Sequence, residues 1–404
     1  MRILILYHSD IISPKPGADE HIYTTAKMLS ESNCVTVLTW GTGDIKKFQE
    51  KNLKIVHIGN NRTVDYSQHK KIPYYIIDLV SYFGIYYILF LRKAKGPSSR
   101  VFSQLNLGAF DVAIHIAFDN NKILKYLKNY SNTKVVELSL VSGLPHYLHN
   151  VRDWFNYIHD HTFLSIFLLK TLNKIMSRIV SWFYVSSLSS NKVISISEYD
   201  RKMLNNVKHL DVVYMPPIHD FGEYFDSVEE NNTILFFSGK SMAATIAINY
   251  IFVAAKKLPQ YNFYITGFTP MNTVNYGKVE NVKMLGYVDE IKFHKVIAKS
   301  SLIIMPLISG SGFQTKLAES LMRAKPIITT SVIACEFPDL VNMEQIIVED
   351  DPREFTNKIK ELMDNKELRL KLSRNAKEYY DSHLNSSLAL KLHLDYLEKI
   401  KQNS

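Results

Sequence analysis

A glycine-containing run at residues 309–319 (SGSGFQTKLAE) follows an apolar segment that ends at Pro306. A helical pattern comes next and stops at Lys325 and Pro326. A strand, a glycine loop and a helix start in this order bring backbone N–H groups and a favourable helix dipole close to an anion. Lys316 adds a positive charge to the helix, and Glu319 follows on the same side, where a carboxylate accepts hydrogen bonds from hydroxyls. The run therefore indicates a nucleotide-sugar site; the alternative is a turn that needs glycine only for its shape.

The length and the apolar pattern predict an α/β protein with two domains. A chain of 404 residues is long for a single core. Apolar strand-like segments alternate with helical ones in two series, which predicts two parallel sheets covered on both faces. The first series lies at 2–7, 35–39, 54–58, 111–116 and 134–138, and the second at 233–237, 262–266, 282–285, 302–305 and 327–329. Tandem prolines at Pro216 and Pro217 mark the expected hinge.

Charge is distributed unevenly along the chain. The net charge is +9, and residues 1–218 carry 26 Lys and Arg against 16 Asp and Glu, a net charge of +10. This basic half is either an ordinary solvated surface or a face that meets an anionic partner such as a membrane leaflet. We expect no nucleic-acid partner, because no basic helix or aromatic platform of a known binding module is present. Cys34 and Cys335, the two cysteines, are expected to be buried free thiols in a reducing compartment.

Several motifs together resemble the family-4 glycosyltransferases. A series of residues here is similar to the family's loop pattern, which is Gly-x-Gly-x-x-x-Lys-x-x-Glu followed by Gly-x-Pro-Val-Val. Many members carry an additional glutamate before this pattern's own glutamate, and this chain has Ser311 at that position. Residues 16–22 (PGADEHI) resemble a second motif of the family near its N-terminus, and 191–204 a third. The residues matching the loop pattern are Gly310, Gly312, Lys316, Glu319, Ser320, Leu321, Pro326, Ile327 and Ile328.

The resemblance implies an α/β fold of the GT-B architecture, with two doubly wound Rossmann-like domains facing a cleft. We expect an acceptor domain at 1–218 and a donor domain at 219–384, with a C-terminal helix at 385–404 crossing back to the first domain. The implied catalytic residues are His115, Lys240, Lys316 and Glu319, with Glu137 and Ser139 as weaker candidates for sugar contact. The implied donor-binding residues are Gly17, Gly239, Gly267, Gly310, Ser311, Gly312 and Phe313.

The implied activity is transfer of a sugar from a nucleoside-diphosphate sugar to a glycan, lipid-linked or other hydroxyl acceptor, with retention of anomeric configuration. Lys240 and Lys316 are expected to neutralise the leaving diphosphate, so neither a metal nor another cofactor is expected. No His or Cys cluster has metal-ligand spacing: His159 and His161 are too close in sequence for one helical face. The alternatives are a nucleotide-sugar-binding or scaffold protein with reduced turnover, and a sugar-nucleotide epimerase of the same fold.

Residues 74–91 (YYIIDLVSYFGIYYILFL) are mostly apolar and precede Arg92 and Lys93. Their length approaches that of a membrane span, but Asp78, Ser81 and Gly84 interrupt the segment. A span, a helix at the membrane interface and a core helix all remain open. Residues 163–183 are amphipathic and basic, a pattern that suits either anionic lipid or ordinary packing. We expect a cytoplasmic protein. A further hypothesis is that it attaches peripherally to the cytoplasmic face of a membrane.

Overall fold

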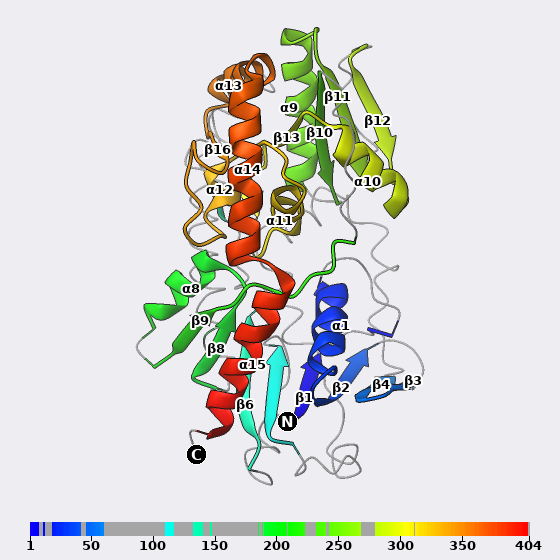
Figure 1. Ribbon diagram of the computed structural model, residues 1–404, viewed down its shortest axis with the longest axis vertical. Helices are drawn as coiled ribbons and strands as arrows, with labels where there is room; N and C mark the ends of the chain where they lie inside the picture. The colour runs from blue at the N-terminus through cyan, green and yellow to red at the C-terminus, as the bar shows by residue number, and fades with distance from the viewer. Residues whose placement is uncertain are drawn as a thin grey trace, which may run out of the picture. The chain divides into compact units, whose positions relative to one another are not determined.

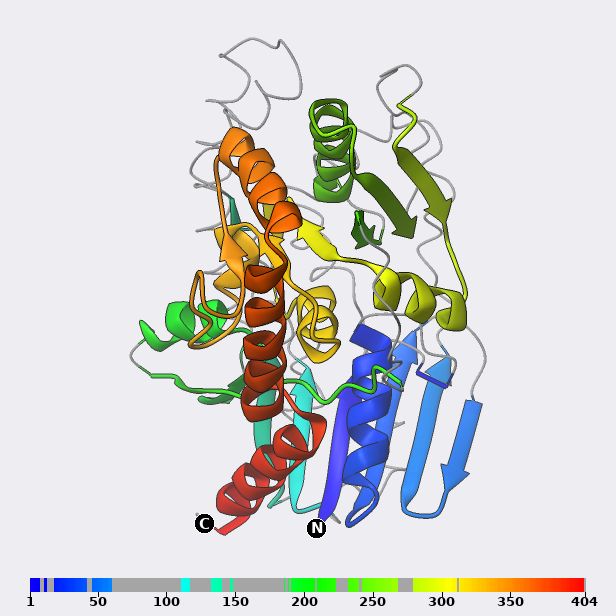
Figure 2. The ribbon, with the colours of Figure 1, turned by 45° about the horizontal axis from the view of Figure 1, so that its top comes forward.

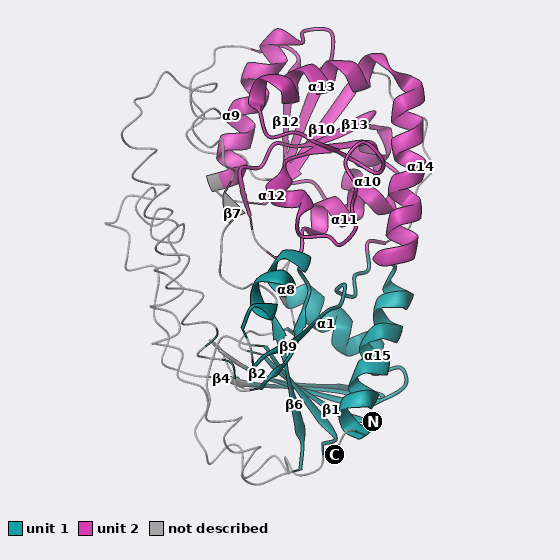
Figure 3. Cartoon of the chain, turned by 90° about the vertical axis from the view of Figure 1, so that its left-hand side faces the viewer, with its two compact units in different colours: residues 1–144, 175–220, 385–404 teal, residues 145–174, 221–384 magenta. Residues whose placement is uncertain are grey.

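The chain forms two compact units (Figures 1 and 3). The computed structural model describes residues 1–7, 11–12, 18–41, 46–59, 110–116, 132–139, 146–147, 185, 188, 190–207, 209–222, 232–239, 242–267, 279–310 and 312–402. Unit 1 comprises 1–144, 175–220 and 385–404, and unit 2 comprises 145–174 and 221–384. The segments predicted at 74–91 and 163–183 lie outside the described residues. Within the described part, no helix has the length and hydropathy needed to cross a membrane.

Unit 1 is built on an eight-stranded sheet in the order β3-β4-β2-β1-β5-β6-β8-β9. All neighbouring pairs are parallel except β3 with β4. The chain builds one side of β1 first and then returns to add β5 on the other side, which is the doubly wound topology. The strands are β1 (Arg2–Tyr7), β2 (Cys34–Gly41), β3 (Lys46–Glu50), β4 (Leu53–Gly59), β5 (Val112–Ile116), β6 (Lys134–Ser139), β8 (Lys192–Ser195) and β9 (Asp211–Tyr214).

Helices from both ends of the chain cover this sheet. The described helices of unit 1 are α1 (Ala18–Leu29), α8 (Glu198–Asn205) and α15 (Ser386–Gln402). α1 and α15 pack against each other, and α15 also contacts β5 (Figures 1 and 2). The C-terminal helix therefore belongs to the N-terminal unit, as the resemblance implied.

Unit 2 has a six-stranded parallel sheet in the order β12-β11-β10-β13-β15-β16. A separate antiparallel pair joins β14 to β7, a short strand that the sequence-based division placed in the first domain. The strands are β7 (His146–Tyr147), β10 (Thr233–Ser238), β11 (Asn262–Gly267), β12 (Val282–Gly286), β13 (Leu302–Met305), β14 (Ser309–Gly310), β15 (Ile327–Thr329) and β16 (Ile347–Val348). The helices are α9 (Met242–Lys257), α10 (Glu290–Lys299), α11 (Thr315–Met322), α12 (Ser331–Ala334), α13 (Pro352–Asp364) and α14 (Lys366–His383).

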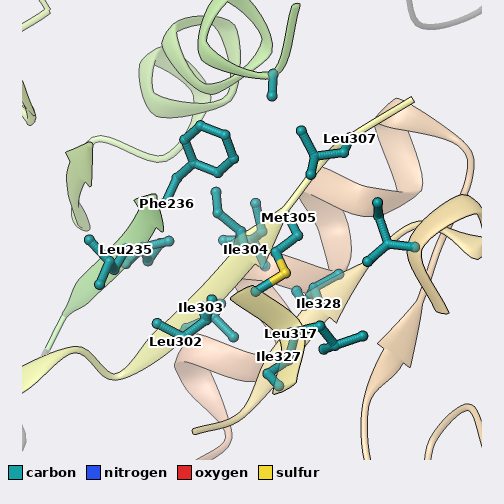
Figure 4. Close-up of a cluster of buried hydrophobic side chains, with 14 of the residues drawn as sticks. Leu235, Phe236, Leu302, Ile303, Ile304, Met305, Leu307, Leu317, Ile327 and Ile328 are labelled. Carbon is teal, nitrogen blue, oxygen red and sulfur yellow. The ribbon is translucent and has the colours of Figure 1, made fainter. Parts of the chain in front are cut away.

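The core of unit 2 explains why α11 holds a fixed position at the sheet. Central strands β10 and β13 are buried on both faces, as expected of a parallel sheet covered by helices. Figure 4 shows Leu317 of α11 among the side chains of β13 and β15. Leu317 has no exposed surface, and full burial of such a side chain contributes about 1.5–3 kcal/mol. The residue beside Leu317 is Lys316, so this anchor also places a cation.

The predicted fold class is confirmed. The ends of each predicted strand differ from those of the observed strand by at most one residue, except that the C-terminal end predicted for 35–39 differs by two. The proline-containing helix start is observed as well: Asp351 caps α13 by accepting hydrogen bonds from the backbone N–H groups of Arg353 and Glu354.

The expectation of two buried thiols was wrong. Both cysteines are free, but Cys34 is exposed and Cys335 is only half-buried.

Three histidines of unit 1 come from separate segments: His21 on α1, His219 after β9 and His393 on α15. The rings of His21 and His219 lie 5.3 Å apart, and Nδ1 of His21 lies 3.3 Å from the carbonyl oxygen of Ile218. Desolvation lowers the pKa of His21 to about 4 and the pKa of His393 to about 4. Desolvation also lowers the pKa of His219. These imidazoles are therefore neutral at pH 7.

We expect acid to destabilise unit 1. Histidines of the unfolded chain take up protons near pH 6.5, whereas His21 and His393 of the folded chain do not. The contribution of these two histidines to the free energy of unfolding is therefore fully present above pH 6.5 and falls as the pH drops towards 4. The loss for each of these two buried histidines is on the order of 3 kcal/mol. Hydrogen exchange at the β1 and β5 amides, measured between pH 7 and 4.5, should show this fall, and His393→Leu should make it shallower. The exposed His209→Leu is the control; equal slopes for the two variants would contradict the prediction.

Candidate functional site

A pocket of about 220 Å³ lies in unit 2, where β10 and β11 end at the same edge of the parallel sheet. Ligands of doubly wound proteins bind at such carboxyl ends. Gly239, Gly267 and Lys316, all singled out from the sequence, line this pocket. The described residues that line it are Phe237, Ser238, Gly239, Thr266, Gly267, Tyr287, Val288, Phe293 and Lys316.

Gly267 makes a close backbone approach at the floor of this edge. It is paired in register with Ser238 and has a φ of +94°, which side-chain-bearing residues rarely adopt. A Cβ atom at this position would lie 2.3 Å from the carbonyl oxygen of Ser238. The neighbouring Thr266 donates its hydroxyl to the carbonyl oxygen of Gly286 at 2.9 Å, which ties the end of β11 to β12. Glycine is therefore required where β11 leaves the sheet.

Aromatic side chains form much of the pocket wall. The rings of Phe237 and Phe293 meet edge to face, with centroids 5.0 Å apart and an angle of 66°. Tyr287, which follows β12, lines the pocket and is 78% exposed. The sequence did not predict these three aromatic residues. Tyr287 and Phe293 follow a turn at Gly286 that carries no motif. Gly286 itself has a positive φ, and a glycine at the end of a strand was the available signal in the sequence.

Lys316 supplies a cation to this largely apolar wall. It is half-buried, and desolvation lowers the pKa of its ammonium group. Among the residues that the structure describes, no carboxylate forms an ion pair with it. A half-buried cation that forms no ion pair with a described carboxylate favours binding of an anion, since an anion would stabilise its charged form.

The glycine loop precedes α11. Gly310 pairs with His146 through the β14–β7 ladder, and Gly312 has a φ of +73°. Phe313 packs its ring 5.1 Å from Phe337 and so fastens the loop to the core. Gln314, the N-cap residue of α11, makes no side-chain capping hydrogen bond. An uncapped helix start with a left-handed glycine before it matches the geometry of an anion site.

Glu319 lies one turn beyond Lys316 and faces a guanidinium. Its Oε1 accepts hydrogen bonds from Arg323 Nε at 3.2 Å and from Nη2 at 3.1 Å. The Glu319 side chain is 15% exposed, whereas that of Arg323 is 2% exposed. Arg323 was missed in the sequence, although its spacing of four residues from Glu319 is the signal for a helical ion pair.

His115 belongs to unit 1, where it meets another predicted residue. It is the register partner of Glu137 across β5 and β6, and its Nδ1 lies 2.6 Å from Glu137 Oε2. Both side chains are buried, at 4% and 0% exposure. A carboxylate that accepts from Nδ1–H fixes the tautomer and orientation of an imidazole. Ser139, which ends β6, is also buried.

Three predicted residues, Gly17, Lys240 and Ser311, lie outside the described residues. The structure thus brings Gly239, Gly267 and Lys316 together at one pocket and places Glu319 on the same helix as Lys316. In the described part of the chain, no group of three or more His, Cys, Asp and Glu side chains is arranged to hold a metal ion.

Comparison with known families identifies the domain that carries this pocket. Residues 232–365 match the family described as glycosyl transferases group 1. This segment is similar to the group 1 glycosyl transferases. The glycosyltransferase chain as a whole matches none of the curated proteins.

Solved structures show the same fold over the full length of this glycosyltransferase. Sucrose-phosphate synthase from Thermosynechococcus elongatus is 12% identical, with a TM-score of 0.66 and complete coverage of both chains. A glycosyltransferase from Rickettsia africae is 14% identical, with a TM-score of 0.62, covering 100% of this chain and 99% of the other. HepE of Anabaena, in complex with UDP and glucose, is 12% identical, with a TM-score of 0.59 and coverage of 99% and 100%. These similarities establish the GT-B fold.

We expect Gly267→Ala to lower the stability of the glycosyltransferase and to disturb its pocket. The added methyl group would collide with the carbonyl oxygen of Ser238, and the backbone at residue 267 would be strained. We expect this to lower the free energy of unfolding by about 1–3 kcal/mol. Gly239→Ala is the matched control, because no described atom lies within 4 Å of its added Cβ. Thermal unfolding should show a lowered Tm for the first variant alone; equal Tm values would contradict the close approach.

Proposed function

We propose that the pocket of unit 2 binds a nucleoside-diphosphate sugar and that the enzyme transfers the sugar to a hydroxyl acceptor. The observation that carries this proposal is Lys316: a partly desolvated cation, without a carboxylate partner among the described residues, in a pocket lined by aromatic rings. The rings suit a planar base, and the ammonium group suits a phosphate. The HepE structures contain UDP, UDP with glucose, and UDP-glucose, which makes UDP a suitable first probe.

The diphosphate would lie between Lys316 and the glycine loop. Gly310, Gly312 and Phe313 lead into the uncapped start of α11, whose N–H groups point along a favourable dipole. Lys240 follows Gly239 in sequence, and Gly239 lines the pocket. Two cations and a helix start together would stabilise the charge that develops on the leaving diphosphate, which is the largest electrostatic demand of the transfer.

The chemistry that we propose retains the anomeric configuration. The acceptor hydroxyl would attack the face from which the diphosphate departs, and the departing phosphate oxygen would take the hydroxyl proton. The new bond joins the acceptor oxygen to the anomeric carbon, while the bond between that carbon and the phosphate oxygen breaks. Glu319 would hold the donor by accepting hydrogen bonds from the ribose. In unit 1, Glu137 would orient the ring of His115.

The acceptor in this proposal is a glycan or a lipid-linked glycan that binds unit 1. Residues 1–218 are basic, and a phosphorylated or membrane-embedded acceptor is anionic. The same charge would hold the enzyme at the cytoplasmic face of a membrane.

Replacement of the pocket cation tests the donor site. Lys316→Met should weaken UDP binding by about 10- to 100-fold, the usual effect of a lost charged hydrogen bond, with the fold unchanged. Calorimetric titration with UDP, GDP and ADP measures this effect. Lys295, an exposed lysine of α10, provides the control, so Lys295→Met should bind like the wild type. Wild-type affinity in Lys316→Met for whichever nucleotide binds would overturn the assignment.

Chelation tests the role given to the two lysines. Because cations of the protein are proposed to neutralise the diphosphate, transfer should continue at its full rate in excess EDTA. The measurement is release of nucleoside diphosphate with and without acceptor, which also reveals a binder without turnover. Analysis of the sugar nucleotide after incubation with donor alone would detect epimerisation. Loss of transfer in EDTA and recovery with Mg²⁺ or Mn²⁺ would contradict the proposal.

A further inference from the structure

From a buried position at the end of α11, Arg323 contacts Glu319 and Phe221 among the residues that the structure describes. Its Nε and Nη2 donate to the same carboxylate oxygen of Glu319, at 3.2 and 3.1 Å. Nη2 also donates to the carbonyl oxygen of Phe221 at 2.8 Å. Phe221 is the first residue of unit 2 after the segment that leaves unit 1. The guanidinium is thus held from two sides, by a carboxylate on its own helix and by the backbone of a distant segment.

The charges around Arg323 make Glu319 its counter-ion. Arginine is almost never fully buried unless it is paired. His294 of α10 is also near: desolvation lowers the pKa of His294, and the charge of Arg323 lowers it further, whereas Glu290 raises it. Glu290 lies at the imidazole, 3.9 Å from His294 Nε2, and its side chain is 77% exposed. Among the residues that the structure describes, the carboxylate in direct contact with the guanidinium is therefore that of Glu319.

We propose that Arg323 is a positioning residue for nucleotide recognition, which orients the Glu319 carboxylate towards the ribose hydroxyls of the donor. This inference rests on the donor site proposed above. A carboxylate accepts about four hydrogen bonds, so contacts from Arg323 are compatible with hydroxyl donors from a ligand. Side-chain carboxylates on a helix surface sample several rotamers, and a fixed guanidinium removes that freedom before the ligand arrives.

The geometry also specifies arginine rather than lysine. Two N–H groups reach one oxygen of Glu319 while a third contact reaches a carbonyl, and this requires a planar fork. A lysine at the same position would keep the positive charge but would offer a single nitrogen on a flexible stem. Arg323→Lys therefore separates orientation from charge.

A purely structural tie at the end of α11 is the competing explanation, and the chain provides a control for it. Lys325 follows two residues later and donates from Nζ to the carbonyl oxygens of Ala298, in a short contact, and Ser300, at 3.0 Å. It ties the segment after α11 to the end of α10 without contacting Glu319. Lys325→Met should therefore lower the Tm and leave recognition of the ribose unchanged.

The experiment compares UDP, GDP and ADP with their 2′-deoxy and 3′-deoxy forms by calorimetric titration. Wild-type protein should bind the ribose form at least about 10-fold more tightly, the value of one charged hydrogen bond. Arg323→Lys and Arg323→Met should reduce this ratio to about 2-fold or less, and Lys325→Met should keep it. In a Glu319→Gln background, Arg323→Met should produce no further change, because the two residues act through one carboxylate.

The outcomes distinguish the two proposals. A protein that binds none of the nucleotides would overturn the proposed function itself. Binding without preference for ribose would overturn the role of Glu319, and the role of Arg323 with it. A ribose preference that survives in Arg323→Lys would overturn the positioning role alone. Arg323→Lys keeps the charge beside Glu319 and decides the matter where Arg323→Met does not fold.

Discussion

A partly desolvated ammonium group at the end of a parallel sheet is the constraint on which the rest of this site depends. Burial of Lys316 disfavours its charged form, and the fold nevertheless holds it there through Leu317, which is fully buried beside it. The core thus forces a cation into a place that is unfavourable without an anion. A ligand phosphate would supply the missing interaction, so apolar packing of α11 and binding of an anion are physically connected.

The sheet that supports this cation is itself limited by backbone geometry. β10 and β11 remain paired up to Ser238 and Gly267, and the chain can turn away only because Gly267 has no side chain. The pocket opens at the point where this pairing ends. Its aromatic wall comes from β10 and from the segment that follows β12, and Thr266 and Gly267 of β11 lie between them, so three neighbouring strands contribute to the pocket. The shape of the pocket therefore depends on strand register more than on any single side chain.

Much of this could be predicted from the sequence, and the reason lies in local pattern. Apolar runs predicted ten strands of the two sheets but not β3, β9 or β16, and the spacing of Gly310, Gly312, Lys316 and Glu319 predicted the loop and helix. The short strands β7 and β14 could not be predicted, because two residues carry no periodicity and their pairing joins segments far apart in sequence. The contact of His115 with Glu137 depends on strand register, which only the fold determines. Tyr287 and Phe293 of the pocket wall could not be predicted either, because no local pattern distinguishes them from core residues.

The eight residues of α11 illustrate how local and distant contacts combine in this enzyme. One face inserts Leu317 and Leu321 into the core, and the remaining positions carry a cation near the start and a carboxylate one turn later. A helix this short has little stability of its own, so its side chains are only as well placed as their tertiary contacts. Leu317 provides such a contact at the cation, and Arg323 provides it at the carboxylate through the carbonyl oxygen of Phe221. Without the guanidinium, Glu319 would keep its place in the sequence motif but would lose the hydrogen bonds that hold its carboxylate.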